Sequence, residues 1–448
     1  MRKLFTLFLL LFGLLVEAIA QEEIPAGPYD LQTAINIALE NNLTLKRNLL
    51  NQEITEATLL QNKGQRYPSL STGSSYGVRW GRSINPVTNL FENNRIGNVN
   101  FQASSNMPIF QGNRVNNSIA QAKTDLEAGL YNLEANKNTI TLNVINHFIN
   151  LVFNREQVKI AENQLKSTTE QMERTKKLVD AGSLPMSDYL DLQSQNASNQ
   201  LEVINAQNAY RGAKLNLAQS MQIPFTEDFD VIEPEFEMEE GLMASETSRE
   251  IFETAVDIMP EIKLAEANIR SAEYQEKIAK GAFYPTLGVG ANVFTNYVDQ
   301  VFGTDRPAFG QQFSDNLSQA LNFQLSIPIF TNFNNKSSLQ RARAQTAIQE
   351  VAALEAKNLL RQDIETAYNS ALAADLSYKA SVVRVKSLQE TFRIAQQRFD
   401  LGAINSVDFQ VAQNNLFNAQ ADLLNAKYTY IFRVKVLDFY LGNPINLN

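Results

Sequence analysis

The stretch Asn106–Phe110 has the sequence NMPIF, and 220 residues later Ser326–Phe330 has the sequence SIPIF. Upstream of each, Tyr67–Leu70 (YPSL) corresponds to Tyr284–Leu287 (YPTL), which lies 217 residues later. Because the order of these segments matches as well as their residues, one unit occurs twice in the chain. We expect the protein to be built from several copies of that unit around an axis.

Between these markers, apolar residues alternate with Gly, Ser, Asn and Gln, which is the pattern of β-strands with one apolar face. Four such strands are predicted, over residues 69–80, 98–109, 287–297 and 321–329. Spans of about 9 to 12 residues are long enough to cross a bilayer at a tilt. The alternative is a soluble sandwich, but no second sheet is predicted for it to pack on.

Four strands cannot close a transmembrane barrel, and open strand edges are not tolerated in lipid. The protein must therefore oligomerise. The connections Gly81–Gly97 and Gln300–Asn316 are predicted as loops at the end of the barrel away from the helices, facing outside the cell.

Long uninterrupted helices are predicted beside the strands, because 113–179 contains a single glycine and no proline, and 332–401 contains neither. Each would be about 100 Å long at 1.5 Å per residue. Shorter helices are predicted over residues 31–64, 186–220, 251–281 and 406–440. A long helix needs apolar cover along its whole length, so two short helices should stack end to end against each long one.

Composition limits the chemistry that the chain can perform. It has no cysteine, His147 is its one histidine, and its net charge is −9. These features predict no enzyme activity, no metal site, no cofactor and no binding of nucleic acid. Residues 1–20 combine Arg2 and Lys3 with an apolar run and the sequence Ala18-Ile19-Ala20, which is typical of a cleaved export signal.

The predicted organisation is a signal peptide (1–20), a first repeat (21–221), an acidic linker or equatorial segment (222–250) and a second repeat (251–448). The linker is rich in carboxylates but matches no calcium-binding loop. The fold class predicted is an internally duplicated α+β membrane protein, with a long coiled-coil α-helical barrel and four β-strands per protomer in a transmembrane β-barrel.

The chain resembles outer-membrane efflux proteins of the TolC type over essentially all of its mature sequence. The repeat, the two Tyr-Pro-x-Leu starts, the two Pro-Ile-Phe ends and two similar turns carry the resemblance. Each turn has an Asp six residues after its glycine; the turns are Ala181-Gly182-Ser183 with Asp188, and Leu401-Gly402-Ala403 with Asp408.

This resemblance implies a homotrimer with one 12-stranded barrel in the outer membrane of a Gram-negative bacterium and a helical tunnel in the periplasm. Closure of the sheet alone would also allow a dimer. The implied function is the passive exit channel of a tripartite efflux or type I secretion system. Its implied partners are outer-membrane lipid, a periplasmic adaptor (membrane fusion) protein and an inner-membrane pump. The alternative is a non-transporting coiled-coil scaffold of the envelope.

The two turns are the candidate sites. A helical hairpin needs a residue that can adopt the left-handed conformation at its tip, which Gly182 and Gly402 supply. The resemblance implies that the tips, Ala181–Ser183 and Leu401–Ala403, dock the adaptor. It also implies that carboxylates line the periplasmic aperture, here Asp188, Asp191 and Asp408. The family's second carboxylate after the second tip is Val411 here, and an arginine of some members is Ile404.

Overall fold

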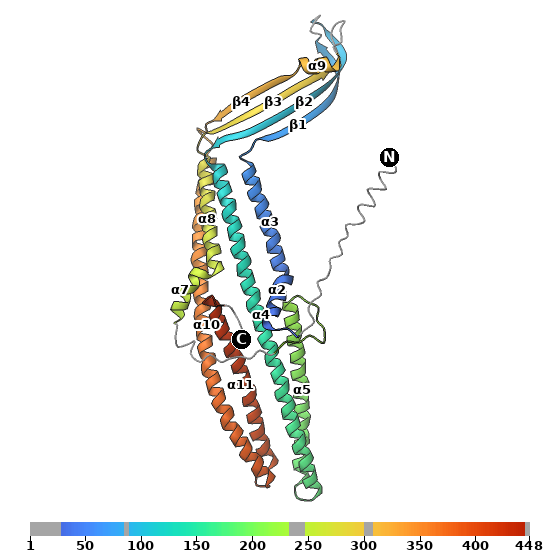
Figure 1. Cartoon of the computed structure of the whole chain (residues 1–448), viewed down its shortest axis with the longest axis vertical. Helices are drawn as coiled ribbons and strands as arrows, with labels where there is room; N and C mark the ends of the chain where they lie inside the picture. Colours follow the sequence, from blue (N-terminus) through green and yellow to red (C-terminus); the bar gives the residue numbers. More distant parts are fainter. Residues whose placement is uncertain (1–27, 85–88, 233–246, 300–307, 444–448) are drawn as a thin grey trace, which may run out of the picture.

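The computed structural model describes residues 28–84, 89–232, 247–299 and 308–443, so the predicted export signal lies outside the described residues. A four-stranded sheet occupies one end of an elongated molecule, and helical rods run from it to two tips at the other end (Figure 1). The elements are α2 (Leu31–Asn41), α3 (Leu43–Gly64), β1 (Ser69–Ile84), β2 (Phe91–Gln111), α4 (Arg114–Asp180), α5 (Met186–Ser220), α7 (Ser248–Ile258), α8 (Pro260–Gly281), β3 (Thr286–Val298), α9 (Phe309–Asp315), β4 (Ser318–Ser326), α10 (Asn334–Asp400) and α11 (Ser406–Tyr440).

The strands follow one another in the order β1-β2-β3-β4, and all neighbours are antiparallel. The β2–β3 pairing joins the two repeats in one sheet. Opposite residues in such a ladder lie on the same face. One face is polar, with Ser71 opposite Ser104 and Gly290 opposite Asn322, and the other is mainly apolar, with Tyr76 opposite Val99.

Two details of the predicted strands were wrong. Most of the predicted loop Gly81–Gly97 is strand, because β1 and β2 stay paired out to Ile84 and Phe91. Ladder bonds come from the backbone, so polar side chains beyond the apolar alternation do not end the pairing. At the other end β4 stops at Ser326 instead of residue 329, just before Pro328, which has no N–H to donate.

The predicted loop Gln300–Asn316 contains the short helix α9 in its described part. This helix packs on the apolar face of the sheet, where Phe313 lies 5.3 Å from Phe101 and Phe309 lies 5.1 Å from Tyr297 between ring centroids. The Gln312 side chain donates to Val298 O and accepts from Val298 N, at 3.2 Å each. Helix α9 thus supplies hydrogen-bond partners to backbone groups at the end of β3, which lies beyond the last residue paired with β4.

The rods match the predicted arrangement. Helices α4 and α10 are each 67 residues long and uninterrupted. Helices α3 and α5 both pack on α4, and α8 and α11 both pack on α10, as the lengths required. Helix α8 also packs on α4, so it lies between the two long rods. Among the described residues, no helix has both the length and the apolar character needed to span a bilayer.

The two predicted first helices, 31–64 and 251–281, are each broken once. Asn42 is extended between α2 and α3, and its side chain accepts hydrogen bonds from Thr44 N (2.8 Å) and Leu45 N (3.2 Å). Met259 is extended between α7 and α8, since the following Pro260 disfavours helical geometry at the residue before it. Both short pieces, α2 and α7, still pack on their long rods, α4 and α10.

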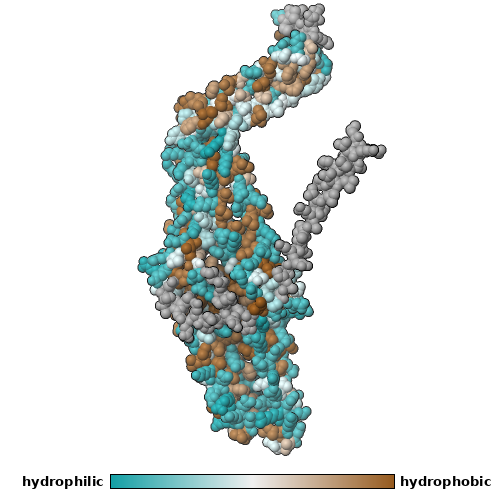
Figure 2. All heavy atoms as spheres, in the orientation of Figure 1, coloured by the Kyte–Doolittle hydropathy of each residue, from teal (hydrophilic) through white to brown (hydrophobic). Residues whose placement is uncertain are grey.

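Apolar packing is concentrated about halfway along the rods. One buried cluster centres on α2, α4 and α5, with Ile145, Phe148 and Leu217 fully enclosed. A second joins α7, α8, α10 and α11 around Ile262, Ile364 and Leu437. The distal ends of the rods are mostly hydrophilic, and the sheet carries more apolar surface (Figure 2). The two hairpins are therefore held together more firmly at their middle than near their tips.

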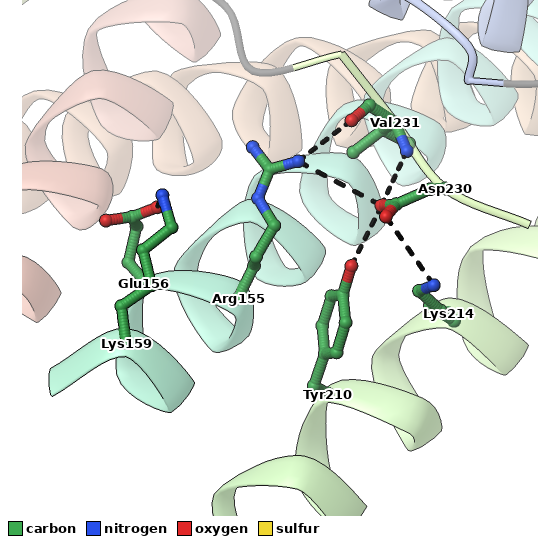
Figure 3. A network of polar contacts seen from close by, with 7 residues as sticks. All are labelled: Arg155, Glu156, Lys159, Tyr210, Lys214, Asp230 and Val231. Carbon is green, nitrogen blue, oxygen red and sulfur yellow. Dashed lines mark hydrogen bonds and ion pairs between the residues drawn. The ribbon is translucent and has the colours of Figure 1, made fainter. Parts of the chain in front are cut away.

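The start of the acidic segment is bound to this middle region (Figure 3). The Tyr210 hydroxyl donates to Asp230 at 2.8 Å, and Lys214 Nζ lies 3.6 Å from the same carboxylate. Arg155 donates to Val231 O at 2.9 Å. Burial, followed by the hydrogen bond to Asp230, raises the pKa of Tyr210 well above its ordinary value, so the hydroxyl remains a donor. Backbone bonds between Tyr29 and residues 230 and 232 tie the start of α2 to the same place.

We expect Asp230→Ala to loosen this attachment, because the change removes the shared acceptor of Tyr210 and Val231 N. Loss of a charge-assisted hydrogen bond should raise amide hydrogen exchange at Tyr29, Val231 and Ile232 by roughly tenfold or more. The matched control is Asp228→Ala, an exposed carboxylate two residues away. Equal exchange in both variants would show that the segment is held by its backbone bonds alone.

Candidate functional site

The first tip joins α4 to α5 through a turn that is closed by its backbone. Gly182 has φ +71°, its N–H bonds to Val179 O at 2.9 Å, and Ser183 N bonds to Leu178 O at 2.8 Å. These two bonds form the Schellman motif, which ends a helix with a left-handed residue. Glycine adopts this conformation without strain, which is the reason the chain has it here.

The second tip, between α10 and α11, repeats this geometry. Gly402 has φ +67°, Gly402 N bonds to Phe399 O at 2.9 Å, and Ala403 N bonds to Arg398 O at 2.8 Å. An ideal Cβ built on Gly182 or Gly402 would meet no atom within 4 Å. All six predicted tip residues are exposed, and Leu401 is exposed to 84%. The tips are therefore exposed, and no neighbouring part of the protomer covers their glycines.

The structure brings two of the three predicted aperture carboxylates together. Ser406, at the start of α11, is buried, and its Oγ lies 3.3 Å from Asp188 Oδ1 and 3.5 Å from Asp191 Oδ2. Both carboxylates belong to α5, so this hydroxyl links the two hairpins. Asp408 is exposed, its backbone N–H is capped by the Asn405 side chain at 2.8 Å, and within the described ranges its carboxylate has no bonded partner.

An ion pair also joins the hairpins near the tips, where Arg174 Nη1 of α4 lies 2.8 Å from Asp400 Oδ1 of α10. Sequence analysis missed Ser406, Arg174 and Asp400. No local signal marks them, because each finds its partner more than 200 residues away along the chain.

The contact between the hairpins stays polar above the tips. Gln413 donates to Ser167 at 3.0 Å and Gln164 donates to Asn414 at 3.3 Å, both between α4 and α11. The Gln413 side chain also has a buried atom, Oε1, without a partner among the described residues. Buried polar atoms without partners destabilise a contact. The distal parts of the two hairpins are thus joined by polar contacts, and separating them should cost less free energy than separating an apolar core.

The interiors of the two distal hairpins differ. In the first, Asn199 donates to Thr168 and Asn196 donates to Thr169, at 2.8 and 2.7 Å. In the second, the ring of fully buried Phe409 stacks on Phe399 with centroids 4.8 Å apart. The two repeats therefore pack their distal helices with different side chains.

At the opposite end of the molecule, the polar face of the sheet is hollowed. A depression of about 500 Å³ crosses β2, β3 and β4 close to the helices. Amide side chains and glycines line its polar side, namely Asn106, Gly288, Gly290, Asn322 and Gln324. A hollowed sheet face whose lining is polar but uncharged, as in this depression, suits the wall of a water-filled channel.

No group of three or more potential metal ligands occurs among the described residues. The arrangement consists of open tips, weak polar contacts between hairpins and a concave polar sheet face. These features suit a conduit through which other molecules pass.

Comparison with known proteins agrees with this geometry. A family model described as outer membrane efflux protein matches residues 34–221 and 253–443. Outer membrane efflux protein BepC of Brucella suis is 21% identical over 90% of this chain and 82% of its own length. The probable efflux pump outer membrane protein TtgC of Pseudomonas putida is 23% identical over 90% and 80%.

Among solved structures, the Campylobacter jejuni CmeC outer membrane channel superposes with a TM-score of 0.80 at 17% identity, covering 93% of this chain and 86% of CmeC. That likeness establishes the fold, and the family match spans both repeats. The chain belongs to the outer membrane efflux protein family and is an outer-membrane exit channel.

Proposed function

We propose that the channel is a homotrimer that conducts substrates passively from a periplasmic adaptor and an inner-membrane pump to the cell exterior. The observation that carries the proposal is that one protomer exposes two complementary lateral edges. The sheet ends in β1 on one side and β4 on the other, and each has one unpaired edge. In lipid these edges require partners, so β4 of one copy should pair with β1 of the next.

The helical rods carry exposed apolar stripes on the same two sides of the protomer as the unpaired strand edges. In Figure 1, α3 and α5 lie along one side of the protomer and α10 along the other. Exposed apolar residues recur at helical spacing on both sides: Leu43, Leu50 and Ile54 on α3, Leu190, Leu201, Ile204 and Leu215 on α5, and Val351, Leu354, Leu372, Leu376, Val383 and Ile394 on α10. Two different surfaces that cover each other give a ring when the rotation closes.

Three copies would close a barrel of twelve strands, four from each chain, which is a size that spans outer membranes. Two copies would give eight strands and a barrel filled by its own side chains. A conduit needs an open lumen, so the trimer fits the function better. The tips then form the periplasmic entrance, where Ala181–Ser183 and Leu401–Ala403 would receive the adaptor.

In this proposal the contacts of Ser406 with Asp188 and Asp191 hold the entrance closed. We expect Ser406→Ala to increase the open fraction, because the change removes the α11 hydroxyl that contacts both α5 carboxylates and with it a polar link between the two hairpins. Loss of one such bond is worth about 1 kcal/mol, which corresponds to a change of roughly fivefold in the ratio of open to closed channels. Single-channel recording in planar bilayers measures this ratio.

Asp408→Ala is the matched control for Ser406→Ala, since Asp408 is exposed on the same turn of α11 and links nothing within the described ranges. Its removal should weaken block by cations at the entrance and leave the closed fraction unchanged. If Ser406→Ala leaves the closed fraction unchanged as well, the contact packs the tips without holding them closed.

The competing function, a non-transporting scaffold, makes the opposite prediction for the unmodified protein. A passive channel requires detergent for extraction and gives stable conductance in a planar bilayer. Release without detergent together with an absence of conductance would contradict the exit channel.

A further inference from the structure

We infer that the outer end of the apolar sheet face binds the phosphate groups of an anionic lipid in the outer leaflet, through Arg82 and Arg95. The site is distinct from the conduit, because it lies on the lipid side of the barrel and at the far end of the molecule from the tips. It requires only that the sheet spans the outer membrane with its helices on the periplasmic side.

The two arginines are neighbours on one face of the β1–β2 hairpin. Trp80 is opposite Arg95, Arg82 is opposite Asn93, and Ile84 is opposite Phe91. Arg82 and Arg95 are therefore diagonal neighbours, about 7–8 Å apart at the backbone. The Arg82 guanidinium lies 4.7 Å from the centroid of the Phe91 ring, so the two side chains share a face. This face is the apolar one, which continues through Trp80 and Tyr76.

Among the described residues, Asp299 is the one carboxylate that forms an ion pair with either arginine. Arg95 Nη1 lies 3.2 Å from Asp299 Oδ2, which also accepts from Gly97 N. Arg82 is exposed and has no ion-pair partner within the described ranges. Asp299 is thus bonded to Arg95, whereas the Arg82 guanidinium lies over the Phe91 ring. An anion bound beside the pair would supply negative charge to Arg82, and guanidinium matches the oxygens of a phosphate in a bidentate way.

The height of the pair corresponds to a membrane surface. Arg82 lies twelve residues beyond Leu70 along β1. At about 3.3 Å per residue and a tilt of about 40°, this separation is roughly 30 Å along the membrane normal, which is the thickness of the hydrocarbon core. With Leu70 at the inner boundary, Arg82 and Arg95 reach the outer headgroups.

Aromatic residues surround the arginines in the manner of an interfacial girdle. Tyr76, Trp80 and Phe91 are all exposed in the protomer, and Trp80 is exposed to 72%. Rings of this kind lie at the headgroup level of membranes. An exposed arginine on the lipid face just beyond such rings meets phosphate groups and little else of opposite charge. The ligand is therefore an outer-leaflet lipid with a phosphorylated headgroup.

The experiment places the full-length protein in phosphatidylcholine nanodiscs, with and without a lipid A that carries two phosphates. Lipid A should raise the temperature at which the oligomer dissociates. In Arg82→Gln/Arg95→Gln this shift should disappear, and affinity for a fluorescent lipid A should fall roughly tenfold or more, as expected for lost charge-assisted hydrogen bonds. Because Arg95→Gln removes the ion-pair partner of Asp299, a triple variant that also carries Asp299→Asn is measured in the same way.

Arg79→Gln is the matched control, since Arg79 is on the same strand but alternates to the polar face with Ser75 and Gly77. It should keep the full lipid shift, and conductance should be normal in all variants. Loss of the shift in Arg79→Gln to the same extent would overturn the site. The lipid assignment would also be overturned if inorganic phosphate, added to nanodiscs without lipid A, gave the same arginine-dependent shift.

Discussion

Gly402→Trp should abolish export while leaving the assembled protein in the outer membrane. A Cβ atom built on Gly402 meets nothing within 4 Å, so a larger side chain starts in open space and we expect the protomer to fold. The backbone cost of a non-glycine residue at φ +67° is about 1–2 kcal/mol, which is small against the stability of a large domain. The indole instead covers the tip where we propose that the adaptor docks. Export of a compound to which a deletion strain is sensitive measures the effect.

Gly402→Ala separates backbone strain from bulk, because it has the same positive φ without the ring. We expect the alanine variant to export nearly as well as the unmodified channel. Gly182→Trp tests the other tip in the same way and should also impair export. Normal export by Gly402→Trp, with oligomers present in the membrane, would remove the second tip from the docking surface.

Leu376→Glu combined with Val383→Glu should prevent trimer formation. Both side chains lie on the apolar stripe of α10 and are exposed in the protomer, to 60% and 66%. The protomer therefore keeps its fold, and helical content by circular dichroism should be unchanged. In the proposed ring both positions are covered by the next copy, where a buried unpaired carboxylate costs several kcal/mol. Chemical cross-linking in membranes and the mass of the purified protein in detergent measure the loss.

The control for this pair is Gln389→Glu, an exposed residue on another side of the same helix. It adds a charge to α10 without entering the stripe, so trimers should form normally. Intact trimers in the Leu376→Glu/Val383→Glu variant would show that the α10 stripe is not the interface between copies.

The sequence predicted helices, strands and turns well where their formation depends on residues close together in the chain. The absence of proline, and of every glycine except Gly129, predicted two helices of about 67 residues, and both have that length. Left-handed glycines were expected at Gly182 and Gly402, and both have positive φ. Pro260 was visible in the sequence, but the break before it was not predicted, because helical periodicity resumes directly after the extended Met259.

Other features depend on partners that are remote in the chain. The strands extend to Ile84 and Phe91 because each is the other's partner, which no alternation of side chains reveals. Helix α9 lies where β4 leaves the edge of β3 unpaired, and its role follows from the unequal lengths of two strands. Asp188 and Asp191 were identified from their places after the first tip, but the buried Ser406 that joins them was not.

The sequence by itself determined the duplicated unit, the rods, the tips and the two faces of the strands, because each depends on spacing within one element and on the conformational limits of Gly and Pro. Only the tertiary structure decided which polar groups join the hairpins, how the acidic segment is bound at Asp230, and which arginines are neighbours on the apolar face of the sheet. Hydrogen bonds and ion pairs act over a few ångströms between residues that the fold brings together from distant parts of the chain, and their partners become visible only when the strands and rods are placed side by side.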